Sequence, residues 1–409
     1  MQVDTLIFGG GAAGLWLLDE LTRRGSSAVL LEAAQLGHGQ TIASQGIIHG
    51  GLKYTLQGLL TRSATAIREM PHIWRACLAG RRAPDLSGTR VRAECCHLWR
   101  TDSVRSRLGM IGARFGLQVT PDEVSRGDRP LILRDCPGIV ARLDEQVISP
   151  AALLADFSAR HQSRILQIDP QNGLAFDVAS TGHVSCVRLV NPTNSDSVLE
   201  LRPAQVIFAA GAGNAQLRKQ AGLSTKVQQR RPLHMVLLRG ELPQLNGHCV
   251  DGARTRVTIT SDTDSTGRTV WQVGGQIAEE GVGQEPQQLI AHTAAQLQAV
   301  LPGLDLTNVE FATYKVDRAE GLSSSGQRPD NIQILQDGNM TTAWPTKLAL
   351  VPQLAETIAG RLSIAEPSSG PAVKLPDDWP RPVVAATPWE TCSHWYGFDS
   401  LTDVSRRAA

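Results

Sequence analysis

Residues 1–32 read MQVDTLIFGGGAAGLWLLDELTRRGSSAVLLE, and this stretch decides the fold. An apolar run leads into a glycine turn, a helical pattern of leucines follows, and the chain returns as a second apolar run that ends in an acid. Gly9, Gly11 and Gly14 have the G-x-G-x-x-G spacing. The first glycine permits the tight turn, the second lets the backbone approach a pyrophosphate, and the third lets helix and strand pack closely. Together these features predict a dinucleotide-binding βαβ unit.

The acid that ends this unit is Glu32, which follows Gly14 by 18 positions. That spacing is close to the one expected for a carboxylate that accepts a ribose hydroxyl. The pyrophosphate is expected at the start of the helix, beside Ala12 and Ala13, where the helix dipole favours negative charge. The alternative is an ordinary βαβ unit whose glycines serve packing only.

The composition is that of a globular protein with room for more than one core. The chain has 409 residues, of which 42% are hydrophobic and 19% charged, and its net charge is +1. No basic cluster indicates nucleic acid as a partner, and no apolar run is long enough for a transmembrane segment. We expect no metal, because no His, Cys, Asp or Glu cluster has ligand spacing. The first strand begins near Met1, without a leader, so we expect a cytoplasmic protein, with peripheral membrane association left open.

Three strands that end in glycine, at 9–14, 208–214 and 335–342, predict a discontinuous domain. Ligand sites in open α/β sheets lie outside the carboxyl ends of the strands, so these distant segments are expected to meet there. The predicted fold class is α/β: a Rossmann-like three-layer domain with a β-rich α+β substrate domain inserted. The first domain would comprise 1–75, 148–229 and 317–409, and the substrate domain would comprise 76–147 and 230–316.

Four further stretches resemble one family. They are Phe208-Ala209-Ala210-Gly211-Ala212, Asp317-Arg318 after a strand, Gly338-Asn339-Met340-Thr341-Thr342, and Gly46-Ile47-Ile48-His49-Gly50-Gly51-Leu52-Lys53-Tyr54. They are similar to segments of the D-amino-acid-oxidase-type FAD-dependent oxidoreductases. That family includes glycine and sarcosine oxidases, 2-hydroxyglutarate oxidases and flavin-linked glycerol-3-phosphate dehydrogenases. The resemblance covers most of the chain and implies FAD as the cofactor.

The resemblance also implies a set of site residues. Carried over by position, His49 falls near flavin and substrate, Arg318 faces the substrate, Lys53 replaces an arginine that grips phosphate, and Tyr54 keeps a tyrosine. Lys53 has a single ammonium group where the family has the planar guanidinium of arginine, and the two bind phosphate differently. Asn339 lacks the charge of the lysine that the dehydrogenases have at this position. Both differences put glycerol 3-phosphate itself in doubt. The cofactor-binding residues expected from motif and resemblance are Gly9, Gly11, Ala12, Ala13, Gly14, Glu32, Ala33, Thr41, Ser44, Gln45, Gly46, Ala210, Gly211, Gly338, Asn339, Met340 and Thr341.

The expected function is an FAD-dependent oxidoreductase that takes hydride from a small anionic hydroxy compound, similar to glycerol 3-phosphate or a 2-hydroxy acid. His49 would accept the hydroxyl proton and Arg318 would hold the anion. One alternative is an amine oxidase of the D-amino-acid or glycine type. Another, of a different class, is a flavin-binding protein without turnover. The electron acceptor, oxygen or a quinone, is left open.

Overall fold

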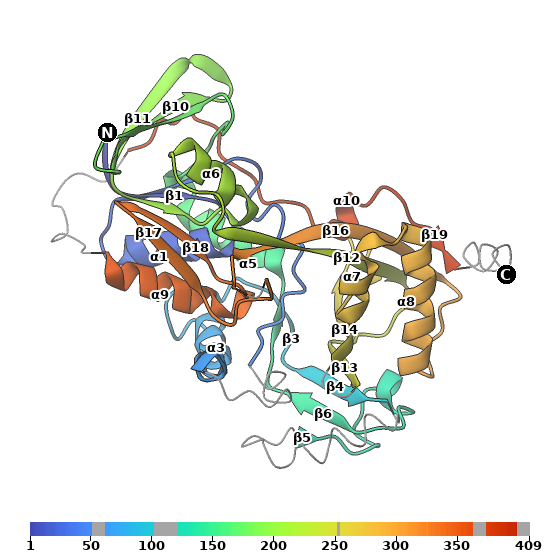
Figure 1. The fold of residues 1–409 in the computed structure, drawn as a ribbon. Coiled ribbons are helices and arrows are strands. Elements are labelled where there is room, and N and C mark those ends of the chain that lie inside the picture. The colour runs from blue at the N-terminus through green and yellow to red at the C-terminus, as the bar shows by residue number, and fades with distance from the viewer. Residues whose placement is uncertain (51–61, 102–121, 252–253, 325, 363–373, 399–409) are drawn as a thin grey trace.

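The computed structural model describes residues 1–50, 62–101, 122–251, 254–324, 326–362 and 374–398. Two large sheets organise the molecule, one of eight strands and one of nine (Figure 1). The two sheets lie side by side. The long strands β12 and β16 belong to the second sheet and extend toward the first (Figure 1). These two strands pair antiparallel along their full length, Gln228–Gly240 with Val309–Gly321.

The first sheet is mostly parallel, in the order β17-β18-β11-β1-β2-β8, and β9 and β10 extend β11. β1, β2, β11 and β18 all end at one edge, which we call the carboxyl edge; Phe8 there pairs with Phe208, and Phe208 with Thr342. The strands of the three predicted segments are therefore neighbours, although the turn at Gly338 lies at the start of β18 and not at this edge. The strands are β1 Gln2–Phe8, β2 Ala28–Glu32, β8 Ile165–Gln167, β9 Leu174–Val178, β10 Val184–Asn191, β11 Asn194–Phe208, β17 Gln333–Asp337 and β18 Met340–Trp344.

Helices cover one face of this sheet and an antiparallel layer covers the other. The helix side packs on one core that includes Ile7, Leu30 and Ile207. The opposite face contributes alternate residues, such as Phe8 and Phe208, to a second core shared with β9 and β10. This gives the three layers expected from the sequence. The helices on the first core are α1 Ala12–Arg23, α3 Arg62–Leu78, α5 Pro150–His161 and α9 Val351–Arg361, and α6 Asn214–Gln220 joins the second.

The second sheet has the order β19-β16-β12-β15-β14-β13-β4-β6-β5. Its outer face packs under α7 and α8 (Figure 1). The strands are β4 Cys96–Arg100, β5 Asp122–Glu123, β6 Val140–Leu143, β13 Gly247–Asp251, β14 Arg254–Thr263, β15 Thr269–Gly274 and β19 Tyr396–Gly397; the helices are α7 Gln276–Glu280, α8 Pro286–Val300 and α10 Pro388–Thr391. A small sheet pairs β3 Val91–Ala93 with β7 Val147–Ile148. Short 3-10 turns lie at Leu131–Leu133, Gln162–Arg164, Gly211–Gly213, Gly281–Gly283 and Leu348–Leu350.

The inner face of the second sheet combines polar residues with an apolar cluster of Leu237, Val270 and Ala312, on which Trp389 of α10 packs. Trp271 and Val273 of β15 pack in the core under α8, and Gln272 between them points to the opposite side. There its side chain contacts Tyr314 of β16 and the backbone of Ala43. The polar side chains of this sheet therefore face the loop that follows Glu32. The exact domain boundaries stay a prediction. In the described ranges, every helix is too short or too polar to cross a membrane.

Candidate active site

The glycine motif lies at the carboxyl edge, where β1 enters α1. Gly9 has φ +110°, and a Cβ on it would lie 2.5 Å from Ala210 Cα. A Cβ on Gly14 would lie 1.9 Å from the Gly9 carbonyl oxygen. Gly11 differs, since a Cβ there would meet only the Thr41 hydroxyl, at 3.1 Å. The fold itself requires Gly9 and Gly14, whereas Gly11 leaves space at the helix start that a ligand can use.

Glu32 lies against this turn, as the spacing predicted. Its carboxylate accepts hydrogen bonds from Gly10 N at 2.5 Å and Ala34 N at 2.8 Å. Ala12 N, at the start of α1, donates to Thr41 Oγ1 at 3.2 Å. Ala13 is buried in the first turn and Ala33 follows the acid directly. The glycine turn and the start of α1 thus bring backbone N–H groups and the Glu32 carboxylate together at the carboxyl edge.

The loop from 33 to 50 is held between the two sheets. Gln45 Nε2 donates to the carbonyl oxygens of Thr258 at 3.2 Å and Gln272 at 2.9 Å. Tyr314 donates to the Ala43 carbonyl at 3.0 Å. A Cβ on Gly46 would lie 2.1 Å from a neighbouring carbonyl oxygen, so this glycine serves close packing. Gln45 and Gly46 are therefore explained by contacts within the protein.

Ser44 differs from its neighbours in this loop. Its Oγ is buried, and within the described residues it has no hydrogen-bond partner. A buried hydroxyl normally has a partner, so one is expected from a bound group. At the end of β11, Gly211 has φ +54° and open space where a Cβ would stand, while Ala210 N donates to Asn214 Oδ1. The space at Gly11, the acid at Glu32 and the hydroxyl of Ser44 together fit a dinucleotide such as FAD.

The register of β18 corrects the expectation for Gly338, Asn339, Met340 and Thr341. Asp337 to Met340 is a hairpin turn between antiparallel β17 and β18, and Met340 pairs with Val206, before the end of β11. Asn339 Nδ2 donates to the carbonyl oxygens of Val184 and Ala204, and its Oδ1 accepts from Val184 N. Met340 is buried in the core, and Thr341 Oγ1 bonds Gln336. This turn therefore joins three strands away from the carboxyl edge.

The segment of this hairpin that does reach the carboxyl edge is its other end, after Trp344. Thr346 has φ +65°, a conformation that non-glycine residues rarely adopt. Its carbonyl accepts from Arg328 Nη2 at 3.3 Å, and its hydroxyl donates to the Asn331 carbonyl at 2.8 Å. Such strained residues cluster at ligand sites. This segment was missed from the sequence, where the only signal was Pro345 between strand and helix.

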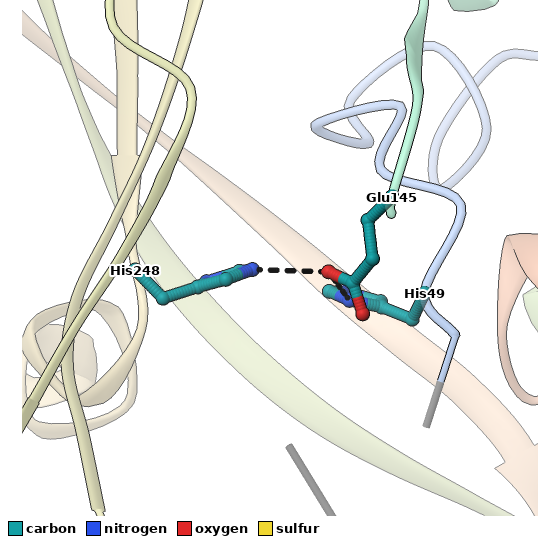
Figure 2. Close-up of side chains that lie close together, drawn as sticks. All are labelled: His49, Glu145 and His248. Carbon is teal, nitrogen blue, oxygen red and sulfur yellow. Dashed lines mark hydrogen bonds and ion pairs between the residues drawn. The ribbon is translucent and has the colours of Figure 1, made fainter. Parts of the chain in front are cut away.

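His49 is brought together with two residues that sequence reasoning missed, Glu145 and His248 (Figure 2). His49 Nδ1 lies 3.3 Å and His248 Nε2 lies 3.6 Å from Glu145 Oε2, and the two rings are 5.5 Å apart. Burial raises the pKa of Glu145, but the two histidines outweigh it and hold that pKa well below its ordinary value. The ligand atoms of the three residues lie within 4.8 Å of one another, close enough to be considered for a metal ion. Lys53 and Tyr54 lie outside the described residues.

Arg318 lies on β16, in register with Arg231 of β12. Its Nη2 donates to Glu279 at 3.0 Å, while its Nε is buried and has no partner among the described residues. Burial lowers the pKa of Arg318, and repulsion from Arg231 and Arg328 adds to this. The next residue, Ala319, donates its N–H to Gln40 of the loop that covers α1. Arg318 thus lies beside the Gln40 part of the loop that reaches His49 nine residues later, with Arg231, Arg328 and Glu279 around it.

Comparison with known proteins places this site in a family. The profile of the DAO family, described as FAD dependent oxidoreductase, matches residues 4–342. A probable FAD-dependent oxidoreductase of Pseudomonas aeruginosa is 37% identical over 395 residues, which are 95% of this chain and 98% of that protein. The crystal structure of that protein has a TM-score of 0.80 to this one, at 34% identity and the same coverage of 95% and 98%.

More distant structures share the fold. Glycine oxidase from Geobacillus kaustophilus has a TM-score of 0.61 at 14% identity, covering 88% of this chain and 94% of its own. L-alpha-glycerophosphate oxidase from Mycoplasma pneumoniae, solved with FAD bound, has a TM-score of 0.60 at 15% identity. The match covers 87% of this chain and 93% of that one. Because the family profile spans most of the chain and a relative matches it almost end to end, this protein belongs to the DAO family of FAD-dependent oxidoreductases and is an enzyme that uses FAD.

Proposed function

We propose that the enzyme oxidises a small anionic hydroxy compound, such as a 2-hydroxy acid or a hydroxyalkyl phosphate. In this proposal Arg318 binds the anionic group and His49 receives the proton of the hydroxyl group. The observation that carries the proposal is the incomplete pairing of Arg318: its Nη2 is bonded to Glu279, but its buried Nε has no described partner. Buried donors are normally satisfied, so a ligand oxygen is the natural partner.

The charges around Arg318 support an anion rather than a neutral ligand. Arg231 pairs with Glu320 through two contacts of 2.8 Å, and Arg231 and Arg328 both lie near enough to Arg318 to repel its charge. A carboxylate or phosphate entering there would gain charge-assisted hydrogen bonds and would relieve repulsion between guanidinium groups. This favours a substrate whose reacting carbon lies close to an anionic group.

His49 favours a hydroxyl over an amine as the reacting group. Its contact with the buried Glu145 carboxylate gives the ring an anionic partner on one side, which suits a general base. A hydroxyl must lose its proton as it is oxidised, whereas a neutral amine can be oxidised with less help from a base. An amino-acid substrate would still place its carboxylate at Arg318, so amine oxidation is the candidate that the experiment must exclude.

FAD, when bound, supplies the acceptor for the two electrons that the substrate loses. The residues that would hold it are those at the carboxyl edge: Gly11 with the start of α1, Glu32, Thr41 and Ser44. The inner face of the second sheet lies against this edge, where Gln272 and Tyr314 hold the loop at Ala43. Assignment of individual residues to FAD atoms stays part of the proposal.

The test is an anaerobic screen of the purified enzyme for bleaching of its flavin absorbance. Glycerol 3-phosphate, 2-hydroxyglutarate, other 2-hydroxy acids, glycine, sarcosine and D-amino acids are added in turn. We expect bleaching by an anionic hydroxy compound and none by its uncharged alcohol analogue. Bleaching by glycine or D-amino acids alone would replace the proposal with amine oxidation.

Arg318→Ala tests the anchor directly. A charge-assisted contact in a closed site contributes about 1.5–3 kcal/mol, so substrate efficiency should fall at least about tenfold while FAD stays bound. Arg230→Ala is the matched control, because Arg230 is the neighbouring arginine on the other side of β12 and is mostly exposed. Equal losses in both variants, or none in Arg318→Ala, would remove Arg318 from the substrate site.

A further inference from the structure

The cluster of His49, Glu145 and His248 is built by backbone pairing as well as by its side chains. Ile48 N donates to the Gln146 carbonyl at 2.9 Å, one residue away from both His49 and Glu145. Ile47 and Val147 form an antiparallel bridge beside it. The loop after the glycine motif and the turn between β6 and β7 are therefore in fixed register. This register sets the His49 ring against the Glu145 carboxylate.

The third member reaches the cluster from the second sheet. His248 lies on β13, which pairs with β4 and β14, and its ring points toward Glu145 (Figure 2). Its Nδ1 lies 2.9 Å from Thr258 Oγ1. The side chains of Glu145 and His248 are 2% and 1% exposed, whereas that of His49 is 22% exposed. The cluster is thus open to ligands at His49 and closed behind it. Within the described residues, His49 is the member of the cluster that reaches the surface.

The contacts of the imidazole rings indicate which ring nitrogen of His49 carries the proton. An ionised carboxylate only accepts hydrogen bonds, so a ring nitrogen that is hydrogen-bonded to Glu145 must be a donor. That makes His49 Nδ1, which lies 3.3 Å from Oε2, an N–H group. His248 Nε2 lies 3.6 Å from the same oxygen, beyond hydrogen-bond distance, and its Nδ1 lies 2.9 Å from Thr258 Oγ1. The second carboxylate oxygen, Oε1, accepts from Gly50 N at 2.9 Å. In a neutral His49 ring the remaining nitrogen, Nε2, is consequently the proton acceptor.

We propose that Glu145 and His248 are positioning residues, which hold His49 in the tautomer and orientation that make its Nε2 the base of the reaction. In the step this serves, the substrate O–H bond breaks and an N–H bond forms at Nε2, and the His49 cation is stabilised by the Glu145 carboxylate. His248 fixes the carboxylate from the other side. The inference rests on the proposed function only in naming the substrate hydroxyl as the proton donor.

Other charged groups near the cluster do not take over this role. Asp144, next to Glu145, turns outward to a bidentate pair with Arg75 of α3. Cys96 of β4 is buried, and burial raises its pKa, with the Glu145 charge adding to this, so it stays a neutral thiol. Arg92 of β3 pairs with Asp262. Glu145 is therefore the carboxylate that acts on both histidine rings.

A metal ion is the competing explanation for two histidines and a carboxylate. The three ligand atoms are close enough, but Oε1 and His248 Nδ1 already have partners in the protein, and a structural site for zinc normally has four ligands. The contacts at His49 Nδ1, Oε1 and His248 Nδ1 are thus explained without an ion, while His248 Nε2 lies 3.6 Å from Oε2. Metal analysis of the purified holoenzyme decides between the two, and a stoichiometric divalent metal would overturn the proposal.

The experiment that needs no substrate is ¹⁵N NMR of the histidine-labelled holoenzyme, with His49 identified by comparison with His49→Gln. We expect the Nδ1–H tautomer for His49 in the wild type and loss of that preference in Glu145→Gln. An Nε2–H tautomer in the wild type would refute the proposal. This readout stands even if no compound in the screen bleaches the flavin, in which case the proposed function fails and the positioning role survives.

With a substrate in hand, the pH dependence of flavin bleaching supplies a second readout. In Glu145→Gln the rate should fall at least tenfold, and the acidic midpoint of the rate profile should move down by about one pH unit or more, because the cation loses its partner. Glu145→Asp should restore part of the rate. Glu94→Gln is the control, since Glu94 contacts the neighbouring Gln146 instead of either ring. An unshifted profile in Glu145→Gln with bound FAD would contradict the positioning role.

Discussion

Two turns that contain glycine lie at opposite ends of the first sheet, and they differ in how their strands are paired. Residues 9–14 follow a parallel strand and begin a helix at the carboxyl edge, where Gly10 N and Ala12 N donate to the side chains of Glu32 and Thr41. Residues 338–341 connect two antiparallel strands, and their polar groups point back into the protein. In sequence the two look alike, since each has glycine and small or polar residues beside an apolar strand.

The difference lies in what each turn leaves unsatisfied. At Gly11 a Cβ would meet only a hydroxyl, so space remains for a ligand. At Gly338 a Cβ would lie 2.5 Å from the Gly182 carbonyl oxygen, and Asn339 bonds both neighbouring strands. A glycine turn therefore indicates a ligand site only when the strand it follows is parallel to its neighbours and ends at the common edge.

The largest effect is expected from Gly14→Ala. The new Cβ would lie 1.9 Å from the Gly9 carbonyl oxygen, so α1 must move away from β1. Overpacking of this kind costs about 3 kcal/mol, and the motif would be distorted at the same time. Both a lower melting temperature and loss of flavin should follow, measured by calorimetry and by absorbance. A variant with wild-type melting and full flavin would show that α1 and β1 do not pack this closely at Gly14.

Asn339→Ala should have a moderate effect, confined to stability. Removing the amide leaves Val184 N–H and the carbonyl oxygens of Val184 and Ala204 without their partner, at a cost of about 2 kcal/mol. Flavin content should be unchanged, because this turn is away from the carboxyl edge. Denaturant unfolding and flavin quantification measure the two quantities separately. Flavin loss without destabilisation would return Asn339 to the cofactor site.

Thr341→Val should have the smallest effect. The change removes one hydrogen bond, from Thr341 Oγ1 to Gln336 Oε1 at 2.8 Å, and keeps the shape of the side chain. Gln336 is exposed and can bond water instead, so unfolding free energy should fall by about 0.5–1 kcal/mol. The flavin spectrum serves as the second measurement. A marked spectral change here would mean that the hydroxyl touches the cofactor after all.

Local patterns in the sequence predicted the parts of the fold that local physics determines. The βαβ unit and the acid at its end follow from short-range spacing, and the structure has β1, α1 and β2 at Gln2–Phe8, Ala12–Arg23 and Ala28–Glu32. Comparison with known proteins confirmed the family and the cofactor FAD, which agrees with the dinucleotide motif at Gly9–Gly14.

The parts that could not be predicted depend on contacts between distant residues. Glu145 and His248 are separated from His49 by 96 and 199 positions, and no spacing relates them. The hairpin at Gly338 was assigned to the cofactor because single-strand patterns do not tell parallel from antiparallel pairing. Thr346 was overlooked because a left-handed threonine has no signature in the sequence.

The central claim is that the carboxyl edge beside Gly11 holds the cofactor, and the flavin content of Gly11→Val tests it most directly. Valine there would fill the space that the protein itself leaves open, with only the Thr41 hydroxyl to displace. We predict a folded protein, with a melting temperature close to that of the flavin-free wild type, that has lost its FAD. A folded Gly11→Val variant that retains one FAD per chain would contradict the claim.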